Sequence, residues 1–142
     1  MGGELVRLER WLLWLGRIVL AAIFAYAAVG KLADPQGFAR ALWNYRMFPD
    51  AVIPYMALGV PALELVVAAG ILLPPLQRGA SLIYLLLLVA FIISLGSAMA
   101  RRLDVDCGCF GEGSSSVGPL LIVRNVALAA VAVWSYIRAG VK

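Results

Sequence analysis

The sequence contains no histidine and only two cysteines, Cys107 and Cys109. Without histidine, the chain cannot form a histidine-ligated haem, a histidine-containing zinc site or a histidine general base. Two thiols are too few to complete a four-cysteine zinc or iron–sulfur site within one chain. We therefore predict no resident metal centre.

Charged residues are also scarce. They make up 14% of the chain, whereas hydrophobic residues make up 63%. A soluble domain is about one quarter charged and one half apolar, so the excess apolar surface must face lipid. The net charge of +4 comes from scattered basic residues with no basic stripe, and this pattern predicts no nucleic-acid partner. A Lys/Arg excess of this kind is typical of the segments that flank membrane helices.

Four long apolar runs cover about 11–32, 51–73, 79–100 and 118–137. Each run is close to the ~20 residues that a helix needs to cross the hydrocarbon core of a bilayer. The many short alternating segments of a membrane barrel are absent from the sequence. The runs predict an all-α fold, an integral membrane four-helix bundle that forms a single domain over residues 1–142.

The breaks between the runs predict one further helix. Asp34-Pro35-Gln36-Gly37 ends the first run, and apolar residues then recur at helical spacing over 38–48. This segment is predicted to be a short helix lying in the membrane interface, between the first and second spanning helices. The N-terminal run also resembles a secretory signal, but it is longer than the usual apolar core of a signal peptide, so we interpret it as a spanning helix.

A Cys-Gly-Cys motif lies in the loop between the third and fourth runs. A disulfide needs Cα atoms about 4.4–6.8 Å apart, and Gly108 allows the backbone to bend enough for Cys107 and Cys109 to meet. A bond in so small a ring should be strained and easily reduced, which suits electron exchange better than structural cross-linking. Asp106 and Phe110 flank the motif as supporting loop residues. Soft-metal binding and incidental free thiols are the alternative interpretations.

Charged side chains inside the apolar runs form a second group of interest. Glu64 lies near the middle of the second run, and a carboxylate at that depth must be neutral, paired or facing a cavity. Arg124, with Asn125 beside it, and Lys31 lie near ends of their helices on the cysteine-loop side, so these residues can converge with Glu64 beneath the loop. They would form a pocket or proton relay, a binding site for a headgroup or quinone, or a structural ion pair. Arg17 is expected to extend to the membrane surface.

The charges do not fix the orientation. Four crossings place both termini and the 74–79 turn on one side, and the 33–50 and 101–117 loops on the other. The Lys/Arg excess that sets topology nearly cancels between these two sides. Charge alone therefore leaves the orientation open.

With these motifs in place, the chain resembles the DoxX-like membrane family, in particular the branch of the methylamine utilisation protein MauE. The matching pieces, in chain order, are Gly30-Lys31-Leu32, Asp34-Pro35, Phe38, Pro61, Glu64, Asp106-Cys107-Gly108-Cys109-Phe110-Gly111 and Arg124-Asn125. The resemblance implies disulfide chemistry outside the cytoplasm alongside a thioredoxin-like partner. It also implies a prokaryotic cytoplasmic (inner) membrane protein with the cysteine loop extracytoplasmic and both termini cytoplasmic.

The leading hypothesis is a membrane thiol–disulfide oxidoreductase, or a redox subunit of one. Cys107 and Cys109 would be the catalytic residues and would exchange disulfides with a thioredoxin-like protein or another disulfide-bearing substrate. A membrane quinone is the candidate electron acceptor, because the chain has neither haem ligands nor a flavin motif. The alternatives are a carrier of Cu(I) or a similar soft metal, since two thiolates suit such an ion, and a non-catalytic assembly or docking subunit.

Overall fold

The computed structural model describes residues 1–102 and 119–140. Within these ranges it contains five helices and no strand. The helices are α1 (Gly2–Ala33), α2 (Pro35–Asn44), α3 (Ile53–Leu72), α4 (Gln77–Ala100) and α5 (Pro119–Gly140). All except α2 are long and apolar enough to cross a membrane. The chain is therefore a multi-pass membrane protein, and the prediction of an all-α, four-helix membrane bundle is confirmed.

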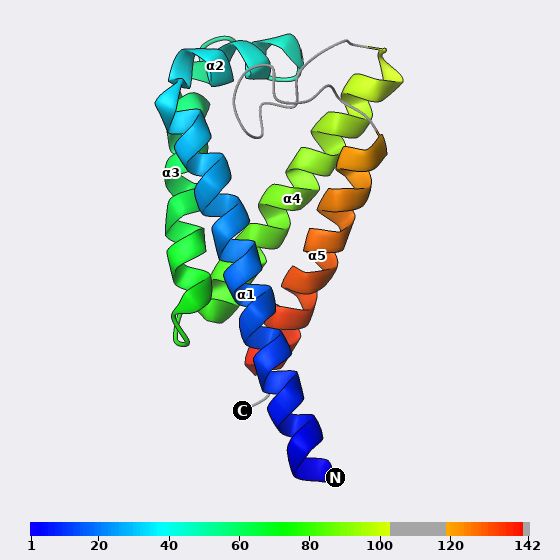
Figure 1. Cartoon of the computed structure of the whole chain (residues 1–142). Coiled ribbons are helices and arrows are strands. Elements are labelled where there is room, and N and C mark those ends of the chain that lie inside the picture. Colours follow the sequence, from blue (N-terminus) through cyan, green and yellow to red (C-terminus); the bar gives the residue numbers. More distant parts are fainter. Residues whose placement is uncertain (103–118, 141–142) are drawn as a thin grey trace.

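The four long helices form two pairs. α1 packs along α3, and α4 packs along α5. The pairs lie close together near the chain termini and diverge toward the opposite end, where α2 lies across the bundle (Figure 1). We call these the termini end and the α2 end. The α2 end holds the C-terminal ends of α1 and α4 and the N-terminal ends of α3 and α5.

A layer of buried side chains joins the two pairs in the middle of the bundle. The rings of Phe24 and Tyr84 stack with their centroids 3.6 Å apart. The Tyr84 hydroxyl donates a hydrogen bond to the backbone oxygen of Leu20 over 3.2 Å, which satisfies a polar group that would otherwise be costly to bury. Val67 and Ile71 of α3 belong to the same cluster. This layer closes the bundle on the termini side of the space between the pairs.

α2 begins where its sequence provides a helix cap. The backbone N–H of Gly37 donates to Asp34 Oδ1 over 2.9 Å, and Pro35 occupies the first helical position. Both features favour helix initiation at this point. A Cβ atom on residue 37 would contact the Asp34 carboxylate in its capping position, so a larger residue there would displace the capping side chain. The helix therefore begins before the predicted 38–48 segment and ends earlier, at Asn44.

α1 starts at Gly2, well before the apolar run that begins near residue 11. Charged residues such as Glu4 and Arg7 mark the end of an apolar run, but they are good helix formers and do not end a helix. The N-terminal part of α1 extends beyond the other helices at the termini end (Figure 1). Hydropathy thus located the spanning segment, but not the helix boundary.

Arg17 differs from its prediction. Its side chain does not extend to the surface, because the residue is only 6% exposed. Its Nε donates to the backbone oxygen of Ile71 over 2.8 Å, within the last turn of α3. The carbonyl groups of a helix C-terminus carry partial negative charge, and they offer Arg17 a partner inside the bundle.

Candidate functional site

Lys31 and Glu64 form a buried ion pair near the α2 end. Lys31 comes from the last turn of α1, and Glu64 comes from the interior of α3. The distance from Lys31 Nζ to Glu64 Oε1 is 2.6 Å, and the two side chains are 1% and 4% exposed. Because isolated charges are costly in such surroundings, each side chain supplies the partner that makes burial of the other tolerable.

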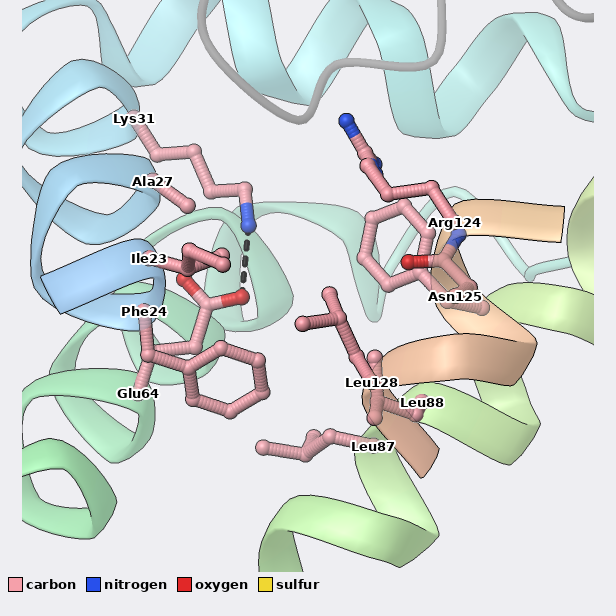
Figure 2. A pocket seen from close by; sticks show the side chains of 11 residues that line it. Ile23, Phe24, Ala27, Lys31, Glu64, Leu87, Leu88, Arg124, Asn125 and Leu128 are labelled. Atoms are coloured by element: carbon pink, nitrogen blue, oxygen red, sulfur yellow. Dashed lines mark hydrogen bonds and ion pairs between the residues drawn. The ribbon is translucent and has the colours of Figure 1, made fainter. Parts of the chain in front are cut away.

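The pair borders a small cavity between the two helix pairs. Arg124 and Asn125 of α5 line this cavity together with Lys31 and Glu64 (Figure 2). Its remaining walls are apolar and consist of Ile23, Phe24, Ala27, Leu87, Leu88, Phe91 and Leu128. The cavity volume is about 30 Å³, which is enough for one or two water molecules. We call this the polar cavity.

Some polar atoms of Glu64 and Asn125 at the polar cavity are buried and have no hydrogen-bond partner among the described residues. They are Glu64 Oε2 and Asn125 Nδ2, an acceptor and a donor. Buried polar groups are nearly always hydrogen-bonded to protein or to water. The size of the cavity suits a water molecule that would bridge such groups. An arrangement of carboxylate, ammonium, amide and water-sized space can hold and transfer a proton.

Two phenylalanine rings also surround the ammonium group of Lys31. The Nζ atom lies 5.2 Å from the ring centroid of Phe38 and 5.3 Å from that of Phe91. Both distances fall within the range of a cation–π interaction. Sequence analysis did not assign a role to Phe91, because a phenylalanine within an apolar run carries no signal that separates it from a packing residue.

Comparison with known proteins identifies the family. The sequence model of the family described as "Methylamine utilisation protein MauE" matches residues 9–138. The chain belongs to the MauE family. It is 36% identical over 127 residues to the methylamine utilization protein MauE of Paracoccus denitrificans, covering 88% of this chain and 68% of that protein. It is also 36% identical over 121 residues to the same protein of Paracoccus versutus, covering 84% of this chain and 65% of that protein.

A third relative, the MauE protein of Methylorubrum extorquens, is 36% identical over 118 residues, which cover 82% of this chain and 63% of that protein. The chain therefore spans about two thirds of the length of these MauE proteins. No solved structure matches the chain. The comparisons thus identify the family, whereas the arrangement of the site comes from the structure of this chain alone.

In this MauE-family chain, the structure brings four of the predicted site residues together. They are Lys31, Glu64, Arg124 and Asn125. Glu64 pairs with Lys31, whereas the Arg124 side chain runs toward the α2 end (Figure 2). The other predicted site residues lie outside the described residues: Asp106, Cys107, Gly108, Cys109 and Phe110. The functional roles of both groups remain predictions.

Proposed function

We propose that this chain is a membrane thiol–disulfide oxidoreductase, or the redox subunit of one, in which Cys107 and Cys109 cycle between dithiol and disulfide. The observation that carries the proposal is a buried ion pair beside a water-sized cavity at the α2 end. The cysteine segment is connected to α4, which ends at Ala100, and to α5, which begins at Pro119, and both of these helix ends lie at this same end (Figure 1). Polar groups that can handle protons thus lie at the end of the bundle where the thiol-bearing segment is attached.

Exchange begins when a thiolate of a reduced thioredoxin-like partner attacks the Cys107–Cys109 disulfide and forms a mixed disulfide. The partner's second thiol then resolves it, which leaves the partner oxidised and Cys107 and Cys109 as thiols. Oxidation of Cys107 and Cys109 to a disulfide releases two electrons and two protons. We propose that a membrane quinone accepts both and becomes a quinol. Glu64 and Lys31 would pass protons by way of the polar cavity, while Gly108 would allow the two sulfurs to meet.

The relatives are named for methylamine utilization. We propose that this chain acts in the same process, as a helper for a disulfide-bearing protein outside the cytoplasm and alongside a thioredoxin-like partner. Disulfides persist in oxidising compartments, so the cysteine segment would face the extracytoplasmic side of the cytoplasmic membrane and both termini the cytoplasm. The pathway in the relatives' name does not by itself identify the substrate of this chain.

Thiol trapping of the purified protein tests the proposal. The protein is equilibrated with glutathione buffers of stepped potential, and free thiols are then alkylated with a mass tag. We expect both thiols to be lost in one two-electron transition. In such a transition, a change of about 30 mV in the buffer potential changes the ratio of disulfide to dithiol tenfold. Of Cys107→Ser and Cys109→Ser, the variant that retains the exchanging cysteine should trap a mixed disulfide with a thioredoxin-like protein, because the second thiol that would release it is absent. Ser115→Ala, in the same segment, is the matched control and should cycle normally.

Two outcomes would contradict the proposal. Stoichiometric binding of Cu(I) by reduced thiols that never form a disulfide would favour a soft-metal carrier. Full cellular function of Cys107→Ser would favour an assembly or docking subunit in which the thiols take no part.

A further inference from the structure

A second cavity lies beside the polar cavity and is larger and mostly apolar. Its volume is about 170 Å³. Its walls come from α2 and the turn after it, from α3 and from α4: Phe38, Leu42, Tyr45, Phe48, Met56, Val60, Leu87, Ala90, Phe91 and Ser94. We call this the apolar cavity. Ala90 is exposed, so the cavity reaches the molecular surface, where a molecule dissolved in the bilayer could enter.

The two cavities share a wall. Leu87 and Phe91 line both of them. The rings of Phe38 and Phe91 face the Lys31 ammonium group over 5.2 and 5.3 Å, and both rings also line the apolar cavity. An apolar space with aromatic side chains in its wall therefore adjoins the cavity that contains a buried cationic hydrogen-bond donor, and the Phe38 and Phe91 rings contact both the space and the cation. This combination suits a flat apolar ring that carries an oxygen acceptor.

We propose that the apolar cavity binds the ring of a membrane quinone, with one ring oxygen directed toward Lys31. The polar cavity is too small for this purpose, since its volume of about 30 Å³ holds only water. An apolar cavity of about 150 Å³ is known to hold benzene, so about 170 Å³ is sufficient for one substituted ring. An acyl chain would also bury apolar surface in this cavity, but a planar ring can in addition stack on the aromatic side chains of its wall.

The apolar cavity would be the site of the electron acceptor in the proposed redox function. The reduction of a quinone at this site therefore rests on that proposed function. A quinone ring here would take up two electrons and two protons and leave as a quinol. Lys31 and Glu64 line the adjoining polar cavity, and the protons would come from that side. Ring binding itself requires only described residues and does not depend on the cysteines.

The turn after α2, which lines the apolar cavity, is hydrogen-bonded to the residue that follows α4. Arg101, just after α4, donates hydrogen bonds through its guanidinium to the backbone oxygens of Tyr45 and Arg46, just after α2. The Tyr45 ring lines the apolar cavity and is only 3% exposed. This link holds the end of α2 over the space between α3 and α4. The ring site is therefore built from three helices, of which α2 and α4 are linked at their ends through Arg101.

Binding of decylubiquinone to the protein in lipid nanodiscs tests the proposal, with affinity measured by calorimetry or by ligand-dependent thermal stabilisation. Ala90→Phe places a ring inside the apolar cavity and should weaken binding at least tenfold. Val89→Phe is the matched control, because Val89 neighbours Ala90 on α4 and is likewise exposed, but does not line the cavity. It should bind as the unsubstituted protein does. Met56→Trp fills the same space from α3 and replaces Ala90→Phe if that variant does not fold.

Decanol separates a ring site from a chain site. If decanol competes with decylubiquinone at equal concentration, the cavity takes acyl chains and the proposal is wrong. Unchanged affinity in both Ala90→Phe and Met56→Trp would also overturn it. The Cys107→Ser/Cys109→Ser variant distinguishes the two proposals: it should still bind the quinone, so a failure of thiol cycling with intact ring binding would refute only the proposed redox function.

Discussion

At the scale of single residues, the Lys31–Glu64 pair places two opposite charges in the interior of the bundle. Both side chains are almost fully buried and they are joined at 2.6 Å. Such a pair adds little net stability compared with apolar residues of similar size, but removal of one partner leaves an uncompensated charge in a low-dielectric region. The pair therefore makes the two single substitutions costly and the double substitution tolerable.

We expect Lys31→Met to lower the free energy of unfolding by about 3–5 kcal/mol, because Glu64 loses its partner. Lys31→Met combined with Glu64→Leu should lose much less, since neither charge remains. The measurement is unfolding of the protein in mixed detergent micelles, followed by circular dichroism. Arg138→Met is the control, because its ion pair with Glu9 is 46% and 35% exposed and should contribute less than about 1 kcal/mol. Equal losses for Lys31→Met and Arg138→Met would contradict the prediction.

Sequence analysis located these residues but not their partners. Helix direction and depth were sufficient to bring Lys31, Glu64 and Arg124 to one end of the bundle. The choice of Lys31 as partner of Glu64 depends on how α1 and α3 are rotated about their axes, and no hydropathy pattern encodes that rotation. The predicted surface position of Arg17 is wrong for a related reason: its partner is a backbone oxygen of α3, and backbone groups carry no sequence signal.

At the scale of elements, α2 is the helix with the clearest local cause. Its cap joins Asp34 Oδ1 to the Gly37 N–H over 2.9 Å, and its apolar face packs against the start of α3 through Phe38, Leu42, Ile53 and Ala57. The periodicity of the sequence predicted this helix. It did not give the start at Pro35, because the capping residues carry no apolar periodicity.

We expect Asp34→Ala to destabilise α2 locally by about 1 kcal/mol, through loss of the side-chain acceptor for the Gly37 N–H. Hydrogen–deuterium exchange of the α2 amides should become several-fold faster, while exchange in α5 should stay unchanged. Gln36→Ala is the control, since Gln36 is exposed in the same first turn and should leave exchange unaltered. Equal acceleration in both variants would show that the cap does not stabilise the helix.

At the scale of the whole molecule, the divergence of the two helix pairs creates both cavities. The apolar runs predict four spanning helices, but they do not state that α1 pairs with α3 and α4 with α5. That arrangement arises from side-chain packing, such as the stacked Phe24 and Tyr84 rings at the point where the pairs meet. Beyond this layer the pairs separate, and the polar and apolar cavities lie side by side beneath α2.

The orientation of the bundle is the property of the whole molecule on which the redox proposal depends most. Gln36 lies at the α2 end and Gly2 at the termini end, and both are exposed. In a Cys107→Ser/Cys109→Ser background, we expect Gln36→Cys to react with a membrane-impermeant maleimide in intact spheroplasts. Gly2→Cys should react only after the membrane is permeabilised, and equal labelling of both variants in detergent is the control for reactivity. The reverse pattern would place the cysteine segment in the reducing cytoplasm, where a labile disulfide would not persist and exchange with an extracytoplasmic partner would be impossible.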